Sequence, residues 1–253
     1  VQSEHVKETK CMNEDGYFNE SVAAIYDDDA ELFAPELVDP VVDVLAKLTT
    51  DGKALEFGIG TGRIAVPMVK RGVFVHGIEI SEAMVTRLIP KSGASNIAVT
   101  MGDFSTTTID ESFSLVYLVF NTIMNLTTQP AQVACFRNAA AHLKPGGCFV
   151  VEVMTPRLQQ LPEGEKLVAW DLNKDHWGID EYDVVTQGLI SHHLRVVKGT
   201  MTKSSIPFRY VWPGELDLMA ELAGMKLKTR WAGWHGEEFT AKSRSHVSAW
   251  ELV

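Results

Sequence analysis

A glycine-rich segment carries the residue pattern with the clearest chemical meaning. Glu56-Phe57-Gly58-Ile59-Gly60-Thr61-Gly62-Arg63 follows an apolar run predicted as a strand and precedes a predicted helix. In that setting glycines let the backbone turn tightly and approach a ligand closely. Glu79 closes the next predicted strand, about 20 residues on, where a carboxylate accepts hydrogen bonds from both hydroxyls of a ribose. The two features together predict a nucleotide or nucleoside site.

The glycine spacing narrows the choice of ligand. A dinucleotide fingerprint has the form G-x-G-x-x-G, and its last glycine lets the helix pack closely below the pyrophosphate. This chain has G-x-G-x-G, and Arg63 stands where a dehydrogenase has Gly or Ala. The pattern therefore favours a nucleoside ligand without a pyrophosphate, and a nicotinamide-dependent oxidoreductase is the alternative.

A second group of reactive and aromatic side chains follows residue 154 and could surround a small molecule. In this group His176 and one of His192 or His193 are the candidates for a general base. Adjacent residues of an extended strand point to opposite faces, so only one of the last two can face a pocket. The aromatic members of this region are Trp170, Trp177, Tyr210 and Trp212.

The elements that position these residues alternate along the chain. Short apolar runs predict strands over 54–57, 74–80, 97–101, 113–120 and 148–154. Helices are predicted over 21–33, 40–48, from a Ser81 cap to Leu88, and from Gln129 to Leu143. This alternation predicts a parallel sheet covered by helices on both faces.

After residue 154 the alternation stops. Runs over 166–171, 182–187, 189–197 and 206–211 predict successive antiparallel strands, with a turn at Gly188. A helix beginning at Pro213 and strands over 226–231 and 246–252 follow. We therefore expect an antiparallel insertion, or lid, within a larger α/β domain.

Composition limits the classes of partner. The chain has 253 residues and a net charge of -10, which repels phosphate backbones and anionic lipid, so neither nucleic acid nor a membrane is an expected partner. Its three cysteines lack zinc or disulfide spacing, and no metal site is expected. The polar first twenty residues lack an export signal, and we expect a cytoplasmic protein.

Several motifs together make the chain resemble the class I S-adenosylmethionine-dependent methyltransferases. The resemblance implies that Glu56 and the three loop glycines hold the methionine part of the cofactor and that Glu79 binds ribose. Ser81-Glu82-Ala83-Met84, Gly102-Asp103-Phe104 and Leu143-Lys144-Pro145-Gly146-Gly147 are similar to further motifs of that family. The cofactor contacts implied are Tyr26, Glu56, Gly58, Gly60, Gly62, Arg63, Glu79, Ile80, Met84, Asp103, Phe104 and Asn121.

The resemblance also implies an architecture. The expected fold is α/β, Rossmann-like, with a seven-stranded, mostly parallel sheet of order 3-2-1-4-5-7-6. We predict an N-terminal arm over 1–39, a core over 40–155 and 212–253, and a substrate-binding antiparallel lid over 156–211.

The implied activity is methyl transfer from S-adenosyl-L-methionine to an oxygen or nitrogen of a small metabolite, with an aromatic or sugar-bearing natural product as the candidate, and S-adenosyl-L-homocysteine is released. The expected acceptor contacts are Tyr17, Met154, Trp177, Arg195, Tyr210, Trp212, Trp234 and Arg244. The sequence does not identify the acceptor molecule. It also does not determine the oligomeric state, for which a homodimer is one candidate.

Each of these residues also has a purely structural interpretation. The glycine segment can be a turn without a ligand, Glu79 and Asp103 ordinary strand-end carboxylates, Asn121 a cap and Tyr26 a core aromatic. Any single histidine can be a satisfied polar residue, and the base can be absent. A catalytically silent methyltransferase-like module is the remaining alternative.

Overall fold

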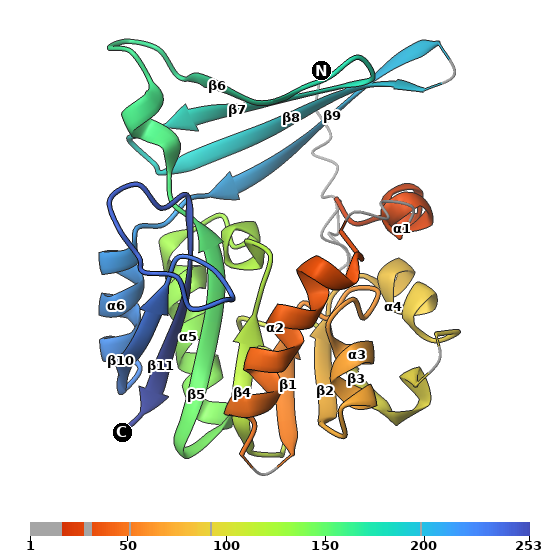
Figure 1. Cartoon of the computed structure of the whole chain (residues 1–253), viewed down its shortest axis with the longest axis vertical. Coiled ribbons are helices and arrows are strands. Elements are labelled where there is room, and N and C mark those ends of the chain that lie inside the picture. The colour runs from red at the N-terminus through yellow and green to blue at the C-terminus, as the bar shows by residue number, and fades with distance from the viewer. Residues whose placement is uncertain (1–16, 28–31, 51, 92, 198) are drawn as a thin grey trace, which may run out of the picture.

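A computed structural model describes residues 17–27, 32–50, 52–91, 93–197 and 199–253 in two stacked parts (Figure 1). The lower part is a seven-stranded sheet between layers of helices, and the upper part is a separate four-stranded sheet. The upper sheet lies across the edge where β1, β4 and β5 of the lower sheet end. This edge is where ligands bind in open α/β folds.

The large sheet has the order β10-β11-β5-β4-β1-β2-β3. Its strands are β1 (Lys53–Phe57), β2 (Phe74–Glu79), β3 (Ile97–Met101), β4 (Phe113–Leu118), β5 (Leu143–Met154), β10 (Met225–Trp231) and β11 (Ser245–Leu252). β11 runs antiparallel to both β5 and β10, and the other neighbours are parallel. Counting only core strands, this is the predicted order 3-2-1-4-5-7-6, which is confirmed.

Helices cover both faces of this sheet because its strands carry apolar side chains on both sides. The helices are α1 (Glu20–Tyr26), α2 (Pro35–Leu48), α3 (Ala65–Lys70), α4 (Glu82–Leu88), α5 (Gln129–His142) and α6 (Pro213–Leu222), with short 3-10 turns at η1 (Ala94–Asn96), η2 (Thr122–Asn125) and η3 (Arg157–Gln160). Two apolar clusters result, one under α2 and α3 and one under α5 and α6. Ala54 belongs to the first and Leu55 to the second, as strand alternation requires.

Ser81 caps α4 as predicted. Its hydroxyl accepts a hydrogen bond from the Met84 amide at 3.2 Å, which satisfies one of the free amides at the helix start. Its own hydroxyl proton is donated to the Phe18 carbonyl at 2.5 Å. The same serine therefore starts α4 and ties the segment before α1 to it.

The upper sheet, called the lid here, consists of β6 (Leu167–Leu172), β7 (His176–Asp183), β8 (Gly188–Val197) and β9 (Thr200–Arg209), all antiparallel. Buried Arg209 fixes its base to the core. The Arg209 guanidinium bonds Glu215 of α6 at 2.8 Å and also donates to Gln132 of α5. A buried guanidinium costs free energy unless paired in this way, so the contact specifies how the lid joins the core.

Several predicted boundaries were wrong. The strand predicted over 182–187 is β7, which ends at Asp183, and residues 184–187 form the turn that was placed at Gly188. Gln187 adopts the positive φ of 56° expected of such a turn. The helix predicted from Pro40 begins at Pro35, because Pro35 suits a first helical turn while Pro40 is accommodated inside. α1 ends at Tyr26, and part of the predicted 21–33 helix, like residues 1–16 of the arm, lies outside the described residues.

Among the helices of the described ranges, none has the length and apolar character needed to cross a membrane.

Candidate functional site

The glycine loop bends sharply between β1 and α3. Gly58 and Gly60 have φ values of 68° and 55°, in the left-handed region that favours glycine. A Cβ on Gly58 would lie 2.9 Å from Thr122 of η2, so the loop packs closely against the end of β4. Gly62 packs closely against α4, because a Cβ added at this position would lie 2.3 Å from Leu88. It lines neither of the two cavities described below.

Glu79 connects the ends of β1 and β2. Its Oε2 accepts from the Gly60 amide at 2.7 Å, and its Oε1 accepts from the amides of Ile80 and Ser81 at 3.0 and 2.9 Å. The carboxylate is buried and lies in the wall of a cavity of about 180 Å³. Loop and strand end are therefore held together by one negative charge.

This smaller cavity combines acids with apolar walls. Asp103 lies in it and accepts a hydrogen bond from the Ser105 amide at 2.7 Å. The apolar walls come from Ile80, Met84, Phe104 and Leu126. Two carboxylates beside such walls suit a flat heterocycle whose attached groups carry hydroxyl and amino donors.

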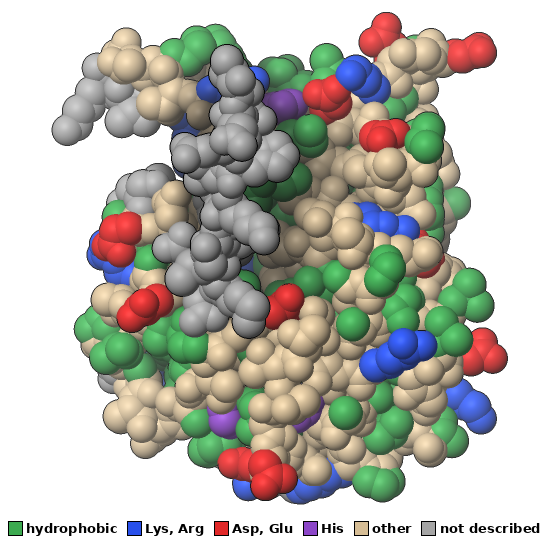
Figure 2. All heavy atoms as spheres, turned by 180° about the vertical axis from the view of Figure 1, so that it is seen from behind, with side chains coloured by type: hydrophobic (Ala, Val, Ile, Leu, Met, Phe, Trp, Pro, Cys, Tyr) green, Lys and Arg blue, Asp and Glu red, His purple; other side chains and the backbone are tan. Residues whose placement is uncertain are grey.

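A larger cavity of about 410 Å³ adjoins it and shares lining residues with it, among them Tyr26, Gly58 and Gly60. Burial raises the pKa of the Tyr26 hydroxyl. From behind, Figure 2 shows a hollow between lid and core with hydrophobic side chains inside it. The two cavities thus have lining residues in common at the carboxyl ends of the strands, and together they are called the cleft here.

Glu56 is the most unusual acid of this cleft. It is buried, and burial raises its pKa to about 8. The Tyr117 hydroxyl donates to its Oε2 at 2.8 Å. A cationic amine placed beside Glu56 would be stabilised once the carboxyl group ionises. Close by, the Arg63 guanidinium lies over the Phe120 ring at 3.1 Å from its centroid.

Asn121 connects the ends of β4 and β5. Its Oδ1 accepts from the Met154 amide at 2.6 Å, and its φ of 62° is left-handed. Both residues line the larger cavity. Asn121 therefore fixes the backbone that lines this part of the larger cavity. Its contact with the cofactor stays a prediction.

The lid supplies the other wall of the larger cavity. Its lining side chains there are Trp170, Asp180, Leu189, Ser191, His193 and Phe208, joined by Arg157 of η3. Asp180 and Ser191 face each other across β7 and β8, and Asp180 is almost fully buried. Burial raises the Asp180 pKa. The lid thus adds a mixed apolar and charged surface.

Of the three predicted histidines, only His193 lines this cavity. His176 contacts it, since its Nε2 lies 3.1 Å from His193 Nδ1. His192 faces away and contacts Ser205 and Glu181. The expected opposition of neighbouring strand residues therefore selects His193.

Among the predicted acceptor contacts, Met154 lines the larger cavity and the others do not: Tyr17, Trp177, Arg195, Tyr210, Trp212, Trp234 and Arg244. Tyr210 is buried in the core, and Trp234 donates its indole proton to Glu152 at 2.9 Å. Arg195 and Arg244 are exposed. For Trp177, its place outside this lining favours no acceptor contact, and for the other six the role of acceptor contact stays an untested prediction.

Sequence inspection missed several cavity residues, namely Phe18, Arg157, Asp180, Ser191 and Phe208. Strand alternation from His193 would have found Ser191, because both lie on one face of β8. Trp170 was recognised as an aromatic of the lid but was not among the predicted contacts.

Comparison with known proteins now adds to this geometry. A family model described as a methyltransferase domain matches residues 54–147, which contain the glycine loop, Glu79 and Asp103. The structure of the CcbJ methyltransferase from Streptomyces caelestis superposes with a TM-score of 0.84 and 31% identity, covering 95% of this chain and 99% of that one. The chain belongs to the class I S-adenosylmethionine-dependent methyltransferases.

Two further relatives agree with this methyltransferase assignment. The cypemycin N-terminal methyltransferase from a Streptomyces species is 26% identical over 237 residues, which cover 92% of this chain and 96% of that protein. CalS10, an amino pentose methyltransferase from Micromonospora echinaspora solved with its cofactor bound, shares the fold at a TM-score of 0.69 and 18% identity, covering 92% of this chain and 97% of that one. The cofactor of the methyltransferase is S-adenosylmethionine, and the comparisons support neither the oxidoreductase nor the silent-module alternative.

The cleft fits this cofactor on its own chemistry. The acids of the smaller cavity suit the donors of an adenosine, and buried Glu56 suits the ammonium of the methionine part. The larger cavity leaves room beyond the loop for a second molecule.

Proposed function

We propose that this methyltransferase transfers the methyl group to a small molecule held between the glycine loop and the lid, with an amine as the preferred acceptor and a hydroxyl as the second candidate. The observation that carries this proposal is the larger cavity, whose wall is shared by Gly58 and Gly60 on one side and by lid residues on the other. A molecule in that space would lie between the cofactor loop and the lid.

The chemistry requires alignment and exclusion of water more than reactive groups. The cofactor, when bound, supplies an electrophilic methyl group on a sulfonium. We assign Glu79 and Asp103 to the nucleoside and Glu56 to the ammonium of the methionine part. The side chains of Trp170, Leu189 and Phe208 would exclude water from the acceptor. Their contacts with the acceptor would also hold it in line with the methyl group.

Charge favours an amine. Asp180 is a buried carboxyl group in the cavity wall and could hold an ammonium group of the acceptor. Arg157 lines the same cavity and would suit an electron-rich group elsewhere on that molecule. The names of two similar enzymes, a cypemycin N-terminal methyltransferase and a glycopeptide N-methyltransferase, support nitrogen as well, and CalS10 is named for an amino pentose.

The division into an arm over 1–39, a core over 40–155 and 212–253 and an acceptor lid over 156–211 is part of this proposal.

A cytoplasmic location is proposed too, and the free, buried thiols of Cys135 and Cys148 support it.

Two tryptophans provide a matched test. Trp170 lines the larger cavity and Trp177 does not, although the two side chains are similarly exposed, at 37% and 38%.

The acceptor class is tested first. Labelled S-adenosylmethionine is offered with amino sugars, aromatic amines and phenols and, for comparison, with transfer RNA and proteins. We expect label in small molecules, most strongly in amines.

The Trp170→Ala variant should then raise the acceptor KM about tenfold or more through lost apolar contact, with the Kd for S-adenosylhomocysteine within about twofold. Trp177→Ala should change neither. Label confined to macromolecules, or equal kinetics of the two variants, would contradict the proposal.

A further inference from the structure

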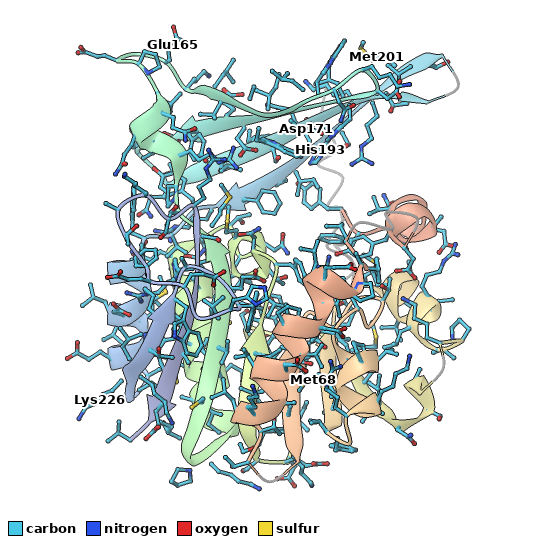
Figure 3. All side chains as sticks on the ribbon, viewed as in Figure 1. Met68, Glu165, Asp171, His193, Met201 and Lys226 are labelled. Atoms are coloured by element: carbon cyan, nitrogen blue, oxygen red, sulfur yellow. The ribbon has the colours of Figure 1, made fainter. Side chains whose placement is uncertain are left out.

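Three side chains form a continuous hydrogen-bonded chain across the lid. Asp171 Oδ2 lies 2.5 Å from His176 Nδ1, and His176 Nε2 lies 3.1 Å from His193 Nδ1. His193 lines the larger cavity, whereas the Asp171 side chain is about one-third exposed. Asp171 and His193 appear together on the lid in Figure 3. The row of hydrogen-bonded side chains thus leads from the larger cavity to the solvent.

Trp170 and Gly178 hold this chain in place. The indole ring of Trp170 contacts both imidazoles edge-on, with centroids 5.5 Å from His176 and 5.2 Å from His193. A Cβ on Gly178 would lie 2.3 Å from that indole, so only glycine leaves room for it. A glycine in the middle of a strand is explained by this close approach.

The tautomers follow from the order of the bonds. Asp171 as a carboxylate only accepts, so His176 carries its proton on Nδ1 and its Nε2 is left to accept. His193 then carries its proton on Nδ1, and its Nε2 holds a lone pair. The hydrogen bonds of these three side chains therefore leave the unprotonated Nε2 of His193 at the end nearest the cavity.

His192 has no part in this chain. It lies on the opposite face of β8, where its ring nitrogens contact Ser205 at 2.8 Å and Glu181 at 3.3 Å. It is therefore a natural control for effects of a lid histidine as such.

We propose that His193, His176 and Asp171 form a proton relay that takes the proton released by the methyl acceptor and passes it toward the outer side of the lid. The inference rests on the proposed function, because it places the acceptor beside His193. Within it, His193 is the catalytic residue, and His176 and Asp171 are positioning residues that act through it.

The proton balance is simple. For a hydroxyl or ammonium acceptor, the O–H or N–H bond breaks, the proton goes to His193 Nε2, and the electron pair left on the acceptor atom forms the new bond to the methyl carbon. A neutral amine forms that bond with its lone pair, and the N–H proton of the product goes to His193 Nε2. In both cases the bond from the methyl carbon to the cofactor sulfur would break and leave its electron pair on sulfur, in S-adenosylhomocysteine. The proton on His193 Nδ1 then moves to His176 Nε2. His176 becomes an imidazolium beside the Asp171 carboxylate and releases its Nδ1 proton to water by way of Asp171. Both imidazoles are then protonated on Nε2, and exchange of these protons with water returns them to the Nδ1 tautomers of the resting state.

The charges around His193 agree with a group that conducts a proton and does not retain it. Burial, together with the smaller effects of Arg195, His176 and His192, lowers the His193 pKa to about 4. Asp180, Trp170 and Arg157 complete the surroundings on the cavity side. His193 is therefore neutral at pH 7 and free to accept, and a proton reaching it is passed on readily.

The first test needs no acceptor. Nitrogen-15 spectra of the histidine-labelled wild-type protein at pH 7 should show both His193 and His176 protonated on Nδ1 alone, with assignments from His193→Gln and His176→Gln. A His193 protonated on Nε2, or on both nitrogens, would overturn the relay.

The second test uses an amine that the protein methylates. His193→Ala should lower kcat at least about 100-fold with little change in the Kd for S-adenosylhomocysteine, and added imidazole should restore part of it. Asp171→Asn should lower kcat by a smaller factor, and His192→Ala should leave it unchanged. An unchanged kcat in His193→Ala, or a loss that imidazole does not restore, would refute the relay; failure to methylate any small molecule would instead refute the proposed function.

Discussion

Single carboxyl groups determine most of what the cofactor site can do. Glu79 accepts three backbone hydrogen bonds, two of them from residues that directly follow it. Glu56 is buried next to a tyrosine hydroxyl. Glu79 is thus fixed by backbone amides, whereas burial raises the pKa of Glu56, and the two acids should respond differently to mutation.

Replacing Glu79 should weaken cofactor binding. The Glu79→Ala variant should lose about 2 to 3 kcal/mol in binding S-adenosylhomocysteine, which is roughly a 30- to 150-fold rise in Kd, because charge-assisted hydrogen bonds are removed. Calorimetry measures it, and Glu82→Ala on the neighbouring helix is the control. An unchanged Kd would show that Glu79 does not bind the ribose.

Cofactor binding should release protons at neutral pH. With a pKa of about 8, Glu56 is protonated in the free protein at pH 7, and the ammonium of the bound ligand favours its carboxylate. Affinity should therefore rise with pH, by up to about tenfold per unit, and level off near pH 8. Binding enthalpies in buffers with different ionisation enthalpies give the number of protons released.

The same pKa shift has a consequence for stability. Because the pKa of Glu56 is raised on folding, the contribution of Glu56 to the free energy of unfolding is complete below pH 4.5 and is lost as pH rises toward 8.

For the binding experiment, proton uptake when the cofactor binds, or an affinity that falls with rising pH, would contradict the account of Glu56.

At the scale of elements, strand alternation predicted much of the lid and failed at one irregularity. It showed that only one of His192 and His193 can face the cavity. It could not place Trp170, because the β6–β7 register shifts between Ala169 and Asp171, which leaves Trp170 as an extra residue that turns over Gly178. A bulge changes which residues share a face, and no periodicity in the sequence reveals it.

The glycine loop was predicted as one unit, but its members differ in what they touch. Gly58 and Gly60 line the cavities, while Gly62 packs against Leu88. This division depends on how α4 sits against the loop, which local sequence does not specify.

Gly62→Ala should therefore destabilise the fold by about 1 to 3 kcal/mol, since it combines a left-handed φ of 79° with a Cβ 2.3 Å from Leu88. Gly72→Ala is the matched control, with φ of 84° and no atom within 4 Å of the added Cβ. Chemical denaturation compares the two. Equal losses would show that the contact with α4 has no energetic weight.

At the scale of the whole molecule, the order of the large sheet was predictable because the motifs resemble those of a family, and the lid was predictable because its strand runs interrupt the alternation of strands and helices. Most of the lid residues that line the larger cavity were not predictable. Tyr210 and Trp234 were chosen for their chemistry, yet Tyr210 is buried in the core and Trp234 bonds Glu152 at its edge. Contacts between lid and core are set by tertiary packing, which a single sequence does not display.

The central claim is that the acceptor meets the cofactor from the lid side. A crystal structure of the protein with S-adenosylhomocysteine and a methylated amine product tests it most directly. We predict the nucleoside beside Glu79 and Asp103, and the product in the larger cavity against Trp170, with its methylated nitrogen near His193. A product bound outside that cavity, or a lid turned away from it, would contradict the account.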